Sequence, residues 1–141
     1  LFVMAWAVHW QGGVAGPISD ASWVQRVIAY LVTIPNASRF IVGTQLFGFD
    51  WPLGAKATAL EWDDMTALQA SLAVPVQWDS AAQEPFFTYS DASNISHTAY
   101  FANAQSVQGR LGPARAAGLG VGLWRLGNED QEIWNIPSLT S

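Results

Sequence analysis

The stretch Leu1–Trp10, LFVMAWAVHW, followed by GPIS at Gly16–Ser19, decides the fold of this chain. Its apolar first residues predict a buried β-strand that opens at its carboxyl end into a loop. No initiator Met, cap or earlier element precedes that strand. A strand of this apolarity needs neighbours on both sides. We therefore expect the chain to be the later part of a larger domain, with room for reactive groups upstream of residue 1.

The composition suits a single domain with an unusually apolar surface. The chain has 141 residues, which is a common size for one domain. Charged residues make up 12%, against about 25% in a typical protein, and there are eight Trp. Two explanations stay open: missing chain covers part of this surface, or several Trp line a cleft in which flat rings stack on sugars.

The charge balance and the cysteine count exclude several classes of function. The net charge is −5 and only six residues are basic, so neither nucleic acid nor an anionic membrane surface is an expected partner. No apolar run reaches the roughly 18–20 residues of a membrane-spanning helix. Without Cys, disulfides and thiolate metal sites are excluded. His97 has no carboxylate at metal-ligand spacing, so we expect no metal site.

The first third of the chain predicts a strand, a helix and a second strand. Leu1–Trp6 is the first strand. Apolar residues at helical spacing predict a helix over Trp23–Ile34, with Ser19 or Asp20 as its N-cap. Arg39–Phe47 is the second strand. Short loops join the three elements, which is typical of a βαβ unit with parallel strands.

The remainder predicts an antiparallel excursion followed by a return to the parallel sheet. We expect a loop at Phe49–Pro52 and a poor helix interrupted by Gly109, Gly112 and Pro113. The other predicted elements are a helix over Ala55–Ala73, short strands at Val74–Trp78, Glu84–Ser90 and Ser96–Phe101, the poor helix over Ala102–Ala117, a strand at Gly118–Trp124 and a short helix at Glu129–Trp134.

Six motifs in order carry a resemblance to a known family. They are MAWAVHW with GPIS within Met4–Ser19, the pattern IPNASRFIVGTQLFGFDW at Ile34–Trp51, VQWD at Val76–Asp79, EPFFTYSD at Glu84–Asp91, HTAYF at His97–Phe101 and GLGVGLWRLGNED at Gly118–Asp130. Each motif is weak alone. Together they resemble the carboxyl-terminal part of family 18 glycoside hydrolases, in the bacterial branch that acts on chitin-like or peptidoglycan polymers.

The resemblance implies an α/β fold, a (β/α)8 TIM barrel, of which residues 1–141 would be about strands six to eight. A small antiparallel β insertion would occupy about 74–101. The upstream half of the same barrel is then a partner, and the substrate is a polysaccharide or oligosaccharide. The resemblance implies no cofactor, and it suggests a secreted or cell-envelope bacterial protein. In such barrels the site lies at the carboxyl ends of the strands.

The resemblance also defines the expected chemistry. The family cleaves β-1,4 bonds next to N-acetylhexosamine with retention, using the substrate acetamido group as nucleophile and a Glu as general acid. That Glu ends a D-x-x-D-x-D-x-E run, which is absent here, so we expect no catalytic residue in this chain. The family's M-x-Y-D strand is matched by Met4, but Trp6 replaces Tyr and Ala7 replaces Asp. Losing one positioned polar group commonly costs about 10²-fold or more.

The expected substrate-binding residues are aromatic or lie beside aromatic residues. Trp124 matches the family Trp that forms the floor under the sugar, with a core Trp at the barrel mouth as the alternative. Trp6 and Met4 would lie beside it. Phe47 and Trp51 end the second strand, where packing competes with sugar contact. Asp50 and His9 are interpreted as residues that stabilise loops or turns, and we expect no metal ligand.

The sequence thus indicates a segment of a family 18-like protein that binds or hydrolyses β-1,4-linked N-acetylhexosamine polymers of the chitin or peptidoglycan type. Two alternatives stay open. One is a catalytically inactive saccharide-binding barrel, and the other is a structural half-barrel in a multidomain envelope protein. Whether the parent is an enzyme depends on residues upstream of this chain.

Overall fold

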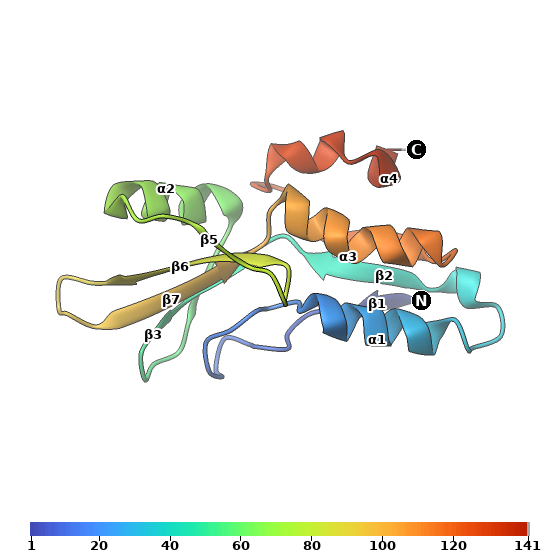
Figure 1. Cartoon of the computed structure of the whole chain (residues 1–141), viewed down its shortest axis with the longest axis horizontal. Coiled ribbons are helices and arrows are strands. Elements are labelled where there is room, and N and C mark those ends of the chain that lie inside the picture. The colour runs from blue at the N-terminus through green and yellow to red at the C-terminus, as the bar shows by residue number, and fades with distance from the viewer. Residues whose placement is uncertain (141) are drawn as a thin grey trace.

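The structure, a computed structural model, describes residues 1–140 and contains two sheets that lie end to end (Figure 1). The first sheet is parallel, in the order β1-β2-β8, with bounds Phe2–Met4, Ile41–Gln45 and Gly120–Trp124. Phe2 pairs with Ile41, which pairs with Gly120. The predicted parallel βαβ unit is confirmed, and the last strand returns to it.

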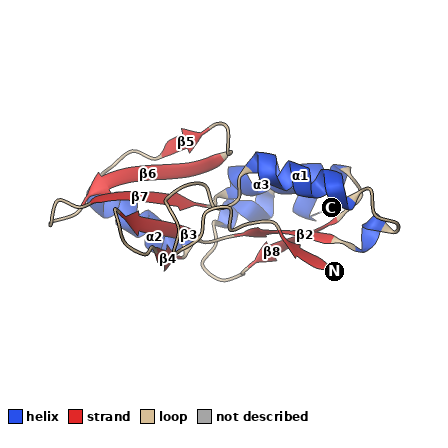
Figure 2. Cartoon of the chain, turned by 90° about the horizontal axis from the view of Figure 1, so that it is seen from below, coloured by secondary structure: helices blue, strands red, loops and turns tan. Residues whose placement is uncertain are grey.

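Two helices cover one face of the parallel sheet (Figure 2). Helix α1, Ala21–Leu31, begins after the N-cap Asp20, whose side chain accepts a hydrogen bond from the Trp23 N–H at 3.0 Å. Helix α3, Ala104–Ala116, begins at a reciprocal capping box between Asn103 and Ser106. The core between these helices and the sheet contains the buried apolar residues Ala5, Val24, Ile28, Leu31, Phe40, Val42, Ala114 and Leu119.

The second sheet is antiparallel and has the order β4-β3-β7-β6-β5. Its strands are β3 Gly48–Pro52, β4 Thr58–Leu60, β5 Gln77–Asp79, β6 Glu84–Ser90 and β7 Ser96–Phe101. Helix α2, Trp62–Leu72, packs on one face through Met65, which is fully buried with Phe87 and Ala99. This sheet carries the predicted antiparallel excursion.

Two predictions about the start of the excursion are wrong. Phe49–Pro52 belongs to strand β3 and not to a loop, and it pairs with both β4 and β7. The helix predicted from Ala55 begins only at Trp62, after β4. Strand β3 is short and ends in Pro52. A proline in so short a stretch favours a loop prediction, because Pro is confined to strand ends and edges. The bounds predicted for the insertion, about 74–101, stay a prediction, although β3 and β4 share its sheet.

The chain ends on the helix side of the parallel sheet. The 3-10 helices are η1, Ala37–Arg39, and η2, Gln131–Asn135, and the short helix α4 spans Pro137–Thr140. Ile133 of η2 packs against the buried residues Val107 and Leu111 of α3. Within residues 1–140, the helices are all too short or too polar to cross a membrane.

Candidate functional site

The face of the parallel sheet opposite the helices is apolar and open. Side chains alternate along the strands, so Val121 and Leu123 pack toward the helices while Gly122 and Trp124 belong to the other face. The large apolar residues on that face are exposed: Phe2 46%, Met4 67%, Ile41 37% and Trp124 52%. Figure 2 shows helices on one side of this sheet only. We call these four residues the open face.

Trp124 stands at the carboxyl end of β8, where its backbone is fixed. It pairs in register with Gln45 of β2, and its carbonyl accepts a hydrogen bond from the Leu46 N–H at 2.7 Å. The next residue, Arg125, donates to the Glu61 carboxylate at 3.2 Å. The Trp124–Arg125 peptide bond is cis. Strand pairing fixes its backbone while the residue stays half-exposed, and the expected contact of Trp124 with sugar stays a prediction.

Glycines let the open face lie flat. The ring of Phe2 lies directly over Gly43 of β2 and Gly122 of β8, so that a Cβ atom at either glycine would collide with it. Phe2 also meets Trp6 edge to face, with ring centroids 6.3 Å apart. Phe2 was not among the predicted site residues, although its place two residues before Met4 puts it on the same face.

Met4 and Trp6 take different positions at the end of β1. Met4 belongs to the open face and is the more exposed of the two. Trp6 is half-buried and packs against the cluster of Ile18, Trp51 and Ala57. The expected contact of Met4 and Trp6 with sugar stays a prediction.

Ala7 adopts a backbone conformation that is unusual for alanine. Its φ is +69°, in the left-handed region. Asp and Asn enter that region more readily than alanine because their short polar side chains bond locally. Ala7 is exposed, so a polar side chain at this position would be free to reach a ligand.

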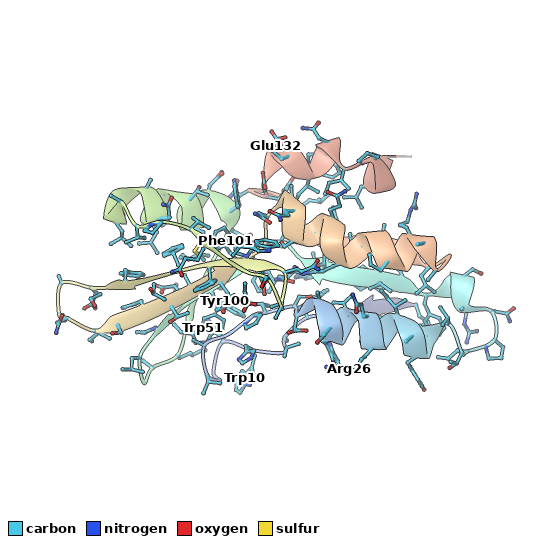
Figure 3. All side chains as sticks on the ribbon, viewed as in Figure 1. Trp10, Arg26, Trp51, Tyr100, Phe101 and Glu132 are labelled. Atoms are coloured by element: carbon cyan, nitrogen blue, oxygen red, sulfur yellow. The ribbon has the colours of Figure 1, made fainter. Side chains whose placement is uncertain are left out.

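Phe47 and Trp51 are part of an aromatic ladder at the junction of the two sheets. Centroid distances are 5.2 Å from Phe47 to Phe49 and 5.3 Å from Phe49 to Trp51. Trp51 is 3% exposed, and its indole N–H donates to the Trp10 carbonyl at 3.3 Å. Figure 3 shows Trp51 and Trp10 near one another. Trp51 therefore packs against its neighbours here, and the expected contact of Phe47 and Trp51 with sugar stays a prediction.

A buried polar network ties both sheets to the loop after β1. The Glu84 carboxylate accepts hydrogen bonds from the Ile18 N–H at 2.7 Å and the Gln45 side-chain amide at 2.7 Å. Its Oε1 atom also lies 2.8 Å from Arg110 Nη2. Both ionic side chains are fully buried. Burial raises the pKa of Glu84, and the Arg110 guanidinium acts in the opposite direction.

This network positions the carboxyl ends of β1 and β2. Arg110 Nη1 donates to Gln45 Oε1 at 3.1 Å, and the Ser19 hydroxyl donates to the Ala5 carbonyl at 2.7 Å. Gln45 in turn pairs with Trp124. The pairing of Glu84 with Arg110 is not predicted from the sequence, because the two residues lie far apart in the chain. The available signal was the position of Arg110, which shares helical spacing with the apolar residues Val107, Leu111 and Ala114 and so lies on the buried face of the helix.

A second polar cluster lies in the antiparallel sheet and corrects two predictions. The Tyr89 hydroxyl donates to Asp50 Oδ2 at 2.7 Å, and His97 Nδ1 lies 3.0 Å from Asp50 Oδ1. His97 Nε2 lies 3.6 Å from the Asp91 carboxylate. Asp50 is therefore a strand residue that pairs two side chains and does not cap a turn. His97 has carboxylate neighbours, which cross-strand pairing brings from distant positions.

His9 stabilises its loop, as expected. Its Nδ1 lies 3.0 Å from the Val14 carbonyl, and its ring packs over Gly16. Over the described residues, no group of three His, Asp or Glu side chains is arranged to hold a metal ion.

The chain is similar in sequence to part of known bacterial enzymes. No protein-family model matches the chain. The cortical fragment-lytic enzyme of Bacillus subtilis (strain 168) is 30% identical over 145 residues, which cover 97% of this chain and 34% of that protein. The enzyme of the same description from Bacillus anthracis is 29% identical, over 95% of this chain and 33% of that protein. The chain thus spans about a third of the length of these curated relatives.

Solved structures share the fold. The Bacillus cereus spore cortex-lytic enzyme SleL superposes with a TM-score of 0.89 at 28% identity, over 96% of this chain and 33% of that one. A chitinase from Chromobacterium violaceum ATCC 12472 superposes with a TM-score of 0.90 at 26% identity, over 99% of this chain and 45% of that one. The chain has an α/β fold similar to a segment of cortex-lytic enzymes and chitinases.

Proposed function

We propose that this chain is the carboxyl-terminal segment, about strands six to eight, of a family 18-type (β/α)8 barrel. The protein containing it would bind β-1,4-linked N-acetylhexosamine polymers of the chitin or peptidoglycan type. The similarity to cortex-lytic enzymes and chitinases supports this proposal, and so does a parallel sheet covered by helices on one face only.

The open face carries the proposal. Trp124 presents a half-exposed ring at the carboxyl end of a parallel strand, which is where barrel enzymes bind their substrates. Met4, at the carboxyl end of β1, extends this apolar surface, whereas Phe2 at the amino end would pack in the filled interior of the barrel. A pyranose ring has an apolar C–H face that can cover such an aromatic ring and remove both from water.

Hydrolysis requires a general acid. The resemblance implies that this acid is the Glu of a D-x-x-D-x-D-x-E run, and this chain contains no such run. The role of these residues is to hold and orient the sugar while the upstream part of the barrel supplies the acid. The isolated chain 1–141 should therefore release no chromophore from a chitobioside above the buffer rate.

A second candidate, a saccharide-binding barrel without hydrolytic activity, is favoured by Ala7. This residue stands where the resemblance expects the Asp that orients the acetamido group, and alanine has no polar side chain for that task. Activity of the natural full-length protein on chitotetraose and on peptidoglycan separates the two candidates. Ala7→Asp should raise a weak activity and should leave a true binding protein inactive.

Trp124→Ala tests the proposal directly in the natural full-length protein. Loss of one stacking platform should weaken chitotetraose binding by about 1–3 kcal/mol, using base stacking on aromatic rings as the analogue, or about fivefold to 150-fold in Kd. Trp134→Ala is the matched control, because Trp134 is exposed in η2 on the helix side. Equal effects of both variants would contradict the proposal.

A further inference from the structure

A cavity of about 540 Å³ lies between the loop after β1 and the β3–β4 turn. Its walls are residues 12–15 on one side and Pro52–Lys56 on the other, with Ser96 and Thr98 of β7 and an edge of Trp51 between them. The volume lies within the roughly 300–1,000 Å³ that is common for small-molecule sites. No residue described above as part of the open face contributes to it.

Hydrogen bonds hold the walls of this cavity in place. The Ala57 N–H donates to the Gln11 carbonyl at 2.9 Å, which joins the two walls. The Leu53 N–H donates to the Ser96 carbonyl at 2.8 Å, which ties the turn to β7. A site whose walls are already ordered loses little conformational entropy on binding.

The lining of the cavity combines apolar surface with two hydroxyl groups and one cation. Most of its surface is apolar, and Ser96 and Thr98 supply hydroxyl groups. Lys56 is the only lysine in the sequence. It makes no ion pair with any residue in the described range 1–140, and no lining residue is acidic. In a protein of net charge −5, an exposed ammonium without a carboxylate partner is a local attraction for an anion.

The cavity lies next to the proposed sugar-binding surface. Trp6 contacts Phe2 of the open face on one side and packs against the cluster that contains Trp51 on the other. Trp51 in turn lines the cavity. A chain of packed aromatic residues therefore connects the open face to this cavity.

We propose that this cavity is a second subsite, which takes an N-acetylhexosamine unit carrying a carboxylate on a short aliphatic substituent. Lys56 binds the carboxylate, Ser96 and Thr98 supply hydroxyl partners, and the apolar walls cover the aliphatic part. One ammonium suits a monoanion, whereas a phosphate dianion is usually held by several donors or by Arg forks. The proposal rests on the proposed function and selects peptidoglycan-type over chitin-type polymers.

The test compares three probes on the natural full-length protein by isothermal titration calorimetry, or by kcat/KM where the protein cleaves them. The first probe is chitotetraose, which is neutral. The second is a tetrasaccharide of alternating N-acetylglucosamine and N-acetylmuramic acid with free lactyl carboxylates. The third is the same tetrasaccharide with peptide stems, whose carboxylates lie further from the sugar. The second and third probes distinguish the two sources of the carboxylate.

Lys56→Gln should weaken binding of at least one acidic probe about threefold to tenfold, the range of one charge-assisted contact near the surface. Binding of chitotetraose should not change. Lys56→Arg should retain the preference for the acidic probe, and higher salt should reduce it. Arg39→Gln is the matched control, because it removes the same charge from the amino end of β2.

The outcomes separate the two proposals. A wild-type protein that binds no probe overturns the proposed function and this inference together. A protein that binds all three probes equally, or whose Lys56→Gln variant matches Arg39→Gln for every probe, overturns this inference alone. A thermal melt of each variant shows whether a change in binding comes from unfolding.

Discussion

Replacement of Glu84 by alanine should destabilise the protein more than any surface change. The carboxylate is fully buried and accepts hydrogen bonds from the N–H groups of Ile18 and Ser19, at 2.7 and 3.3 Å, and from the Gln45 amide at 2.7 Å. It also pairs with Arg110 at 2.8 Å. Glu84→Ala removes all four contacts and leaves an unpaired cation inside the protein.

The magnitude follows from those contacts. Breaking a buried ion pair by removing one partner costs about 3–5 kcal/mol, and each N–H left without a partner costs about 1–3 kcal/mol. These costs overlap, because the region relaxes and water enters, so we expect about 4 kcal/mol in total. A typical domain has a stability of about 5–15 kcal/mol, so the variant should stay folded with a much lower urea midpoint.

A double-mutant cycle with Arg110→Met isolates the ionic part. Replacing both ionic partners removes the uncompensated charge, so Glu84→Ala/Arg110→Met should be at least about 2 kcal/mol more stable than the sum of the single changes implies. Urea unfolding of the natural full-length protein at pH 7 measures each variant. Glu132→Ala, at an exposed site, is the control and should lie within about 0.5 kcal/mol of wild type. A loss below 1 kcal/mol for Glu84→Ala, or additive single changes, would refute this reasoning.

Three further predictions concern backbone strain, alkaline pH and the isolated chain. Ala7→Gly should raise stability by about 1 kcal/mol in urea unfolding, because glycine adopts a φ of +69° without strain; a loss of stability would contradict this. Burial, together with Asp79, raises the pKa of Tyr100 to about 12 from 10. The unfolded chain therefore ionises first, and stability should fall between pH 10 and 12; Tyr100→Phe should lessen that fall and Tyr30→Phe, at an exposed site, should not. The isolated chain 1–141 should aggregate or dimerise through the edge strand at Leu1–Trp6, because its apolar side chains are exposed; a monomer with a sharp thermal transition in size-exclusion and melting experiments would contradict this.

Local pattern was enough to predict the parallel sheet. The runs around Val42 and Val121 are short and apolar, and they form β2 and β8. Helix α3 forms within the predicted range Ala102–Ala117 despite Pro113, because the capping residue Asn103 and the buried residues Val107 and Leu111 outweigh poor intrinsic propensity.

The features that the sequence does not predict depend on contacts between residues far apart in the chain. Asp50 is interpreted from sequence as a turn residue, because its strand partner Ala99 and its side-chain partners Tyr89 and His97 lie about forty to fifty residues away. Glu84 and Arg110 are likewise joined only by the fold. The position of Trp51 was not predicted for a similar reason. A tryptophan at a strand end can stack on a ligand or pack inside the protein, and the segments that pack around it in the fold decide which.

The most direct test of the account is a crystal structure of the natural full-length protein with chitotetraose bound. We expect an eight-stranded parallel barrel in which β1, β2 and β8 are neighbouring strands, with a sugar ring stacked on Trp124 at the carboxyl ends of these strands. A sugar bound on the helix side, or a Trp124 ring packed beneath protein with no room for a ligand, would contradict this proposal.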